Sequence, residues 1–137
     1  MRKKILFICR GNIFRSRISE SFLRYYPNFE VRSAGIESKG ETISKNTLKA
    51  MREINLSIKR KKPEQLKENM LIWADLVIAL DKRVIIYIKE HKWYDKYRKK
   101  IKLWDTPDKH KKDIVGIRKV RNILIKRIKN EFNLQVS

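Results

Sequence analysis

The stretch "KKILFICRGNIFRSRISESFLRYY", Lys3 to Tyr26, decides the fold of this chain. It opens with an apolar run at residues 4–9, of the kind a buried strand needs, and that run ends at Cys9, the only cysteine. A short loop containing Gly11 follows, and residues 16–26 then place apolar side chains at helical spacing. The stretch therefore predicts a strand, a loop and a helix in direct succession.

The rest of the chain continues the alternation of strands and helices. Further strands are predicted at residues 29–33, 74–80 and 100–105, and helices at 44–56, 63–72, 81–90 and 114–132. This order predicts an α/β fold, a three-layer sandwich in which helices flank a four-stranded parallel sheet. No repeat or linker divides the chain, so residues 1–137 are predicted to form one domain.

Composition limits the class of protein. With a single cysteine, the chain can form no internal disulfide and no cysteine-rich metal site. No N-terminal segment combines an apolar stretch with a small-residue cleavage site, so we expect no signal peptide. The longest apolar runs are too short to span a bilayer. We therefore expect a cytoplasmic protein without a membrane span.

The formal net charge of +20 indicates attraction to nucleic acid, anionic membranes or phosphorylated partners. Lysines are, however, spread through almost every segment of the chain. This distribution favours a general surface charge over a dedicated nucleic-acid site, although nucleic acid stays a possible partner.

The loop after the first strand has the composition of an anion site. A loop that enters a helix points backbone N–H groups at one spot, where the helix dipole adds partial positive charge. Gly11 is expected to supply the left-handed or close-approach geometry of a tight cradle. Cys9 beside Arg15 would be a thiolate, and the planar fork of Arg15 can bind two phosphate oxygens. Ser16 can either cap the helix or donate to the sulfur.

Each of these residues also has an ordinary explanation. A lone Cys9 is usually a small buried hydrophobe, and a lone Arg15 is usually a surface residue. A strand before the loop, a glycine inside it and a helix after it form the context that favours the functional interpretation.

With these residues in place, the chain resembles the low-molecular-weight protein tyrosine phosphatases, whose fold is shared by thioredoxin-coupled arsenate reductases. Residues 9–16, "CRGNIFRS", match the family's Cys-x-Gly-Asn-x-x-Arg-Ser loop. "SAG" at 33–35, "ADLVIALD" at 74–81 and "DTPD" at 105–108 extend the resemblance over essentially the whole chain.

The resemblance implies a hydrolase that forms a phosphocysteine on Cys9, with a phosphorylated protein or a small aryl phosphate as substrate and with no metal or cofactor. Asn12, Ser16 and Ser33 would hold the loop in shape. The implied phosphate-binding loop comprises Arg10, Gly11, Asn12, Ile13, Phe14, Arg15 and Ser16.

The resemblance also implies a general acid late in the chain. Asp108 takes the place of the family's catalytic aspartate, and Asp105 is the alternative. Lys109 replaces the proline expected after Asp108, and the aromatic residues expected beyond it are missing. Trp93, Tyr94 and Trp104 are each candidates for an aromatic wall or for ordinary packing.

Two departures affect the loop. Phe14 stands where the family often has a second cysteine, so a protective disulfide is absent. Arg17 replaces a proline, and we expect it to add positive charge near the mouth of the loop.

Two rival functions remain open. One is a non-catalytic module that binds phosphate or nucleic acid on the same fold. The other is an arsenate reductase, which would need an external thiol because the chain has no second cysteine.

Overall fold

Four parallel strands form the centre of the computed structural model, which describes residues 2–59, 62–106 and 113–134. Strand β1 lies in the middle of the sheet, in the order β2-β1-β3-β4. The described elements are β1 (Lys3–Cys9), α1 (Arg15–Leu23), β2 (Phe29–Gly35), α2 (Lys45–Arg52), α3 (Glu68–Trp73), β3 (Leu76–Ala79), α4 (Lys82–Glu90), α5 (Tyr94–Tyr97), a 3-10 turn (Arg98–Lys100), β4 (Ile101–Leu103) and α6 (Ile114–Glu131).

The predicted α/β fold with a four-stranded parallel sheet is confirmed. β1 pairs in parallel with β2 and β3, and β3 pairs in parallel with β4. In this register Cys9 lies opposite Gly35, and Ile8 lies opposite Ala79. The carboxyl ends of β1, β2 and β3 therefore meet at one edge of the sheet, where ligands bind in such folds.

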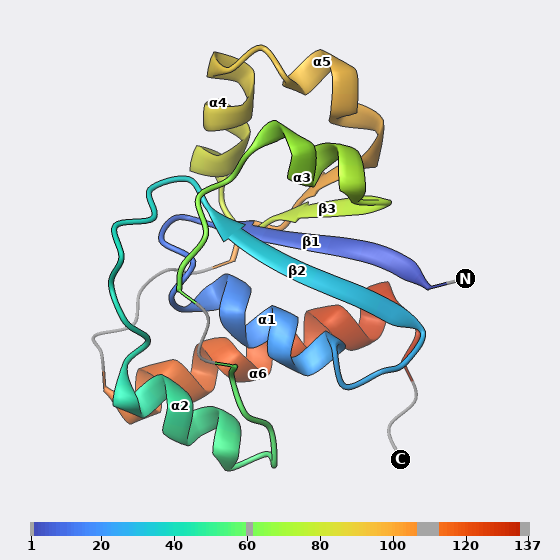
Figure 1. The fold of residues 1–137 in the computed structure, drawn as a ribbon. Helices are drawn as coiled ribbons and strands as arrows, with labels where there is room; N and C mark the ends of the chain where they lie inside the picture. Colours follow the sequence, from blue (N-terminus) through green and yellow to red (C-terminus); the bar gives the residue numbers. More distant parts are fainter. Residues whose placement is uncertain (1, 60–61, 107–112, 135–137) are drawn as a thin grey trace.

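Helices cover both faces of the sheet, as Figure 1 shows. Helices α1, α2 and α6 lie on one face, and α3, α4 and α5 on the other. Alternate residues of β1 supply the two cores: Ile5 and Phe7 belong to the first, and Leu6 and Ile8 to the second. Because β1 is buried on both faces, its sequence is a continuous apolar run rather than an alternating one.

One predicted helix is largely wrong. The sequence predicted a helix over residues 63–72, but α3 begins only at Glu68. Residues 64–66 instead pair with the end of β2: Gly35 N donates to Glu64 O at 2.8 Å, and Leu66 N donates to Gly35 O at 2.8 Å. These backbone groups are used by the neighbouring strand, so they cannot form helical hydrogen bonds.

The other predicted helices differ from their predicted bounds only at the ends, whereas the short helix α5 was not predicted. Asp81 and Ser44 are N-caps, each accepting a backbone N–H with its side chain. The long helix α6 buries Ile117, Leu124 and Ile128. No helix in the described part of the chain is both long and apolar enough to cross a membrane.

Candidate active site

Cys9 lies at the carboxyl end of β1, and its side chain is almost completely buried. Its Sγ lies 2.9 Å from Ser16 Oγ. Ser16 is the second residue of α1. The N-cap residue of this helix is Phe14, whose side chain makes no capping hydrogen bond. Of the two roles predicted for Ser16, the structure thus shows the contact with the sulfur and not the cap.

The left-handed residue of the loop is Asn12, with φ of 58°, and not Gly11. A Cβ on Gly11 would meet Ile13 at 3.5 Å, an ordinary contact. The expectation that Gly11 supplies the left-handed geometry is therefore wrong, and protein atoms leave room for a Cβ at this position. Asparagine tolerates this conformation better than most residues because its short polar side chain can bond locally.

Hydrogen bonds of the Asn12 amide fix that conformation. Its Oδ1 accepts from Glu64 N at 2.9 Å, so its Nδ2 must be the end that faces the loop. Nδ2 donates to Ser16 Oγ at 2.8 Å and to Ser33 Oγ at 2.9 Å. Ser33 in turn donates to Glu20 Oε1 at 2.6 Å. Since Ser16 Oγ accepts from Asn12, its own hydrogen is available to the Cys9 sulfur.

The close approach expected of a glycine occurs at Gly35. A Cβ there would lie 2.8 Å from Arg10 O, from Asn12 N and from the carbonyl carbon of Gly11. All three are backbone atoms of the loop, so they cannot move aside cheaply. The end of β2 is therefore pressed against the loop, and only glycine fits.

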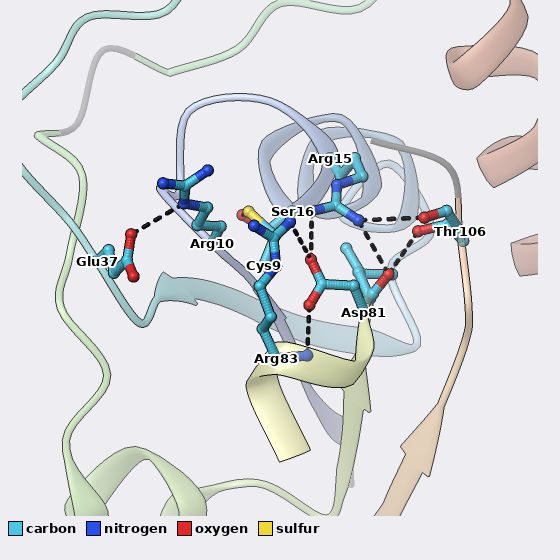
Figure 2. Close-up of polar contacts among 9 residues, drawn as sticks. Cys9, Arg10, Arg15, Ser16, Glu37, Asp81, Arg83 and Thr106 are labelled. Atoms are coloured by element: carbon cyan, nitrogen blue, oxygen red, sulfur yellow. Dashed lines mark hydrogen bonds and ion pairs between the residues drawn. The ribbon is translucent and has the colours of Figure 1, made fainter. Parts of the chain in front are cut away.

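The guanidinium of Arg15 is buried and held by three acceptors (Figure 2). Its Nη1 donates to Leu80 O at 3.1 Å and to Thr106 O at 3.2 Å. Its Nη2 donates to Asp81 Oδ2 at 2.7 Å. These three acceptors follow β3 and β4 in the chain, and together they orient a side chain that belongs to α1.

Asp81 is a site residue that sequence analysis missed. It caps α4 through Arg83 N, which donates to Oδ1 at 2.7 Å, and it also accepts from Arg83 Nη2 at 3.1 Å. Burial raises the pKa of the Asp81 carboxyl, but hydrogen bonds from Arg15 and Arg83 outweigh burial, and the pKa lies below its ordinary value. Its place directly after a buried strand, at the same sheet edge as Cys9, was the available signal.

Arg17 is buried, so the positive charge that it was expected to add near the mouth of the loop is not an exposed one. It is 2% exposed, its Nη2 donates to Lys59 O at 2.6 Å, and its Nε lies 3.7 Å from Glu20 Oε1. Burial lowers the pKa of Arg17, and the charge of Glu20 opposes that shift. Through Glu20, which accepts from Ser33, Arg17 is therefore linked to the hydrogen bonds that hold Asn12.

The remaining loop side chains point in different directions. Arg10 is half-exposed, and its Nε donates to Glu37 Oε2 at 2.9 Å (Figure 2). Phe14 is buried in the core that α1 shares with the sheet, and Ile13 is half-buried. The aromatic side chain at position 14 is thus a core residue.

Of the two candidate acids, the structure describes only Asp105. Its carboxylate is exposed and lies 3.8 Å from Lys82 Nζ. The next residue, Thr106, reaches the site: its carbonyl accepts from Arg15. Asp108 and Lys109 lie outside the described residues, so the predicted acid stays a prediction.

The three aromatic candidates pack against other residues. Trp104 is 1% exposed and lies against Phe7, with ring centroids 6.1 Å apart. Trp93 and Tyr94 pack against the second core. Among the described residues, no group of three or more histidine, cysteine or acidic side chains could hold a metal ion.

The sequence matches a known protein family and a known relative. Residues 4–133 match the model of the low molecular weight phosphotyrosine protein phosphatase family. An arsenate reductase of Bacillus cereus (strain AH187) is 40% identical over 81 residues, which are 58% of this chain and only 59% of that reductase.

Solved structures share the fold. The tyrosine phosphatase amsI of Erwinia amylovora has a TM-score of 0.84 at 23% identity, over 97% of this chain and 93% of that one. The YwlE arginine phosphatase of Geobacillus stearothermophilus has a TM-score of 0.80 at 25% identity, over 96% and 93%. Because the family model matches residues 4–133, nearly all of the 137 residues, the chain belongs to the low molecular weight phosphotyrosine protein phosphatase family.

Proposed function

We propose that this protein hydrolyses phosphate monoesters, with protein phosphotyrosine as the substrate, through a phosphocysteine on Cys9. The observation that carries this proposal is the 2.9 Å contact between Cys9 Sγ and Ser16 Oγ, made where β1 ends and α1 begins. Family membership supports phosphatase chemistry in general, and the choice of tyrosine is the finer part of the proposal.

In the first step, Cys9 Sγ would attack phosphorus while the bond between phosphorus and the phenol oxygen breaks. The leaving oxygen takes a proton from a general acid. In the second step, water attacks the phosphocysteine, the S–P bond breaks, and the deprotonated acid takes the proton from water. Ser16, whose oxygen already accepts from Asn12, would donate to the departing thiolate in this step.

Arg15 would bind two phosphoryl oxygens and stabilise the charge that develops on them. Phosphoryl transfer depends mainly on positioning and charge stabilisation, so a guanidinium held in one orientation stabilises the transition state better than a flexible cation. The contacts with Leu80, Thr106 and Asp81 supply that scaffold. Backbone N–H groups of residues 10–16 would complete the cradle.

Asp108 is the proposed general acid. Asp105, the alternative, is turned toward Lys82 and is exposed, which suits a surface ion pair better than a proton donor in a closed site. This comparison supports Asp108 by disfavouring its rival.

A second candidate function is arsenate reduction, favoured by the name of the Bacillus cereus relative. Cys9 would displace water from arsenate and form an S–As bond. An external thiol would then attack the Cys9 sulfur, and arsenite would leave with the two electrons of the broken bond. The mixed disulfide on Cys9 would need a further thiol to restore it, because the chain has no second cysteine.

Two assays on the same preparations separate these functions. Hydrolysis of a phosphotyrosyl peptide is measured with a chelator present, and thiol oxidation is measured with arsenate and glutathione. We expect hydrolysis that is lost in Cys9→Ser and little arsenate-dependent oxidation. Arsenate reduction without hydrolysis would replace the phosphatase proposal, and unchanged hydrolysis in Cys9→Ser would refute the covalent route. A phosphoarginyl peptide in the first assay tests the choice of tyrosine.

A further inference from the structure

The side-chain amide of Gln65 joins three segments of the chain. Its Oε1 accepts from Ser38 N at 2.9 Å, and its Nε2 donates to Ile36 O at 2.8 Å and to the hydroxyl of Tyr87 at 3.0 Å. A backbone N–H can only donate and a carbonyl can only accept, so these partners fix both ends of the amide. Gln65 therefore bonds to residues 36–38 much as the backbone of a neighbouring strand would.

The segment held in this way is itself bonded to the phosphate-binding loop. Ile36 N donates to Cys9 O at 3.1 Å, and Glu37 N donates to Arg10 O at 2.7 Å. The side chains of Arg10 and Glu37 also form an ion pair, as Figure 2 shows. Residues 36–44 form neither a helix nor a strand, so individual contacts such as these hold the segment in place. Ile36 thus bonds to the loop through its N–H and to the side-chain amide through its carbonyl.

The carbonyls of Cys9 and Arg10 set the direction of two loop N–H groups. In a trans peptide the C=O and the N–H point in opposite directions, and none of the described peptide bonds is cis. Because these carbonyls accept from residues 36 and 37, the N–H groups of Arg10 and Gly11 point away from that segment. Both N–H groups belong to the cradle proposed for the phosphoryl group. Rotation of either peptide would put a carbonyl oxygen in place of a donor, and a carbonyl oxygen repels an anion.

We propose that Gln65 is a positioning residue for phosphoryl binding: its amide holds residues 36–38, and these hold the two peptide groups after Cys9 in the donating orientation. The inference rests on the proposed phosphatase function, because it concerns the same anion cradle. In this role Gln65 acts through the backbone and contacts no substrate atom. Its loss should weaken phosphoryl binding by the folded protein, whereas the loss of a merely structural residue would lower the stability alone.

The test titrates inorganic phosphate into Cys9→Ser and into Cys9→Ser with Gln65→Met, and it follows the backbone amide signals by NMR. Methionine fills a similar space without an amide. In Cys9→Ser we expect the signals of Arg10 and Gly11 to shift on binding. Gln65→Met should raise the Kd for phosphate about tenfold, which is part of the roughly hundredfold cost of losing one oxyanion donor outright. The matched control is Tyr87→Phe, which removes only the third hydrogen bond of the amide and should keep the Kd within about twofold.

Gln65→Glu is the second variant, for the case in which Gln65→Met does not fold. Glutamate keeps the shape of the side chain and the acceptor for Ser38 N, but it loses the donor to Ile36 O, so the Kd for phosphate should also rise. Lys67→Gln lowers the net charge by the same one unit at an exposed position nearby, and it measures the effect of charge alone. An equal rise in Gln65→Glu and Lys67→Gln would overturn the proposal.

Phosphate binding to Cys9→Ser keeps this inference separate from the phosphatase proposal. A Kd that rises with Gln65→Met supports the role of Gln65 even where the parent protein shows no hydrolysis. An unchanged Kd overturns it even where hydrolysis is strong and the variant is less stable in urea. Signals of Arg10 and Gly11 that do not move on addition of phosphate to Cys9→Ser overturn it as well.

Discussion

Arg15 Nη2 donates to Asp81 Oδ2 over 2.7 Å, which joins the first residue of α1 to the residue that caps α4. Both side chains are nearly buried, at 2% and 11% exposure. The ion pair orients the guanidinium before any phosphoryl group arrives, so little ordering is needed when the substrate binds.

Removing the charge of Asp81 should therefore impair both stability and catalysis. Asp81→Asn keeps the shape of the side chain, but it leaves the buried Arg15 without its counter-charge. We expect kcat/KM for an aryl phosphate to fall about tenfold to a hundredfold, because the guanidinium is no longer fixed. The free energy of unfolding, measured by urea denaturation, should fall by about 1–3 kcal/mol. Asp105→Asn, which removes an exposed partner of Lys82, is the control and should cost less than about 1 kcal/mol.

Arg15→Lys should be nearly inactive although it keeps the positive charge. Lysine has no planar fork, so it cannot contact Leu80, Thr106 and Asp81 together and still bind two phosphoryl oxygens. We expect kcat to fall about a hundredfold or more. Steady-state kinetics on an aryl phosphate measure this loss, and activity within a few-fold of the parent would rule out the role given to the guanidinium.

Asp108→Asn should lower turnover strongly for poor leaving groups and much less for good ones. A general acid matters most when the departing oxygen is basic, and its contribution is on the order of a hundredfold to ten-thousandfold. Rates over a series of substituted phenyl phosphates should therefore depend more steeply on leaving-group pKa in the variant. A steeper dependence in Asp105→Asn, with none in Asp108→Asn, would reverse the assignment.

Gly35→Ala should destabilise the protein by about 1–3 kcal/mol, because the new Cβ would lie 2.8 Å from three backbone atoms of the loop. Gly11→Ala is the matched comparison: its Cβ would make an ordinary contact, so stability should change by less than about 1 kcal/mol. Urea denaturation of both variants measures the difference. Equal losses would mean that β2 does not press on the loop as described.

Glu53 should contribute a pH-dependent part of the stability. Hydrogen bonds from Arg118 and Arg121 of α6 outweigh burial and lower its pKa to about 2, from 4.5. Because the folded pKa is depressed, this stabilisation is present above pH 4.5 and is lost as the pH falls toward 2. Glu53→Gln should therefore be less stable than the parent at pH 7, and the two should converge near pH 2. Glu90→Gln, an exposed change of equal charge, should show no such convergence.

Local sequence was enough to predict the strand, loop and helix between Lys3 and Tyr26. The apolar run of β1 is contiguous because both of its faces are buried, and the loop residues follow it without interruption. The alternation of the remaining elements was likewise enough for a parallel sheet, because parallel strands need crossover connections. Cys9, Ser16 and Arg15 could therefore be singled out together from their positions in the sequence.

The tertiary structure alone decided which distant groups complete the site. Asp81, Thr106, Gly35 and Glu64 all reach the loop through the register of parallel strands, which aligns carboxyl ends that are far apart in the chain. Periodicity reports which face of an element is buried, but it carries no information on register between strands. The same limit explains the wrong helix at residues 63–72, where pairing with β2 outweighs local helical preference. Residue type near a strand end thus indicates that chemistry is possible, and packing of the sheet edge determines which side chains take part.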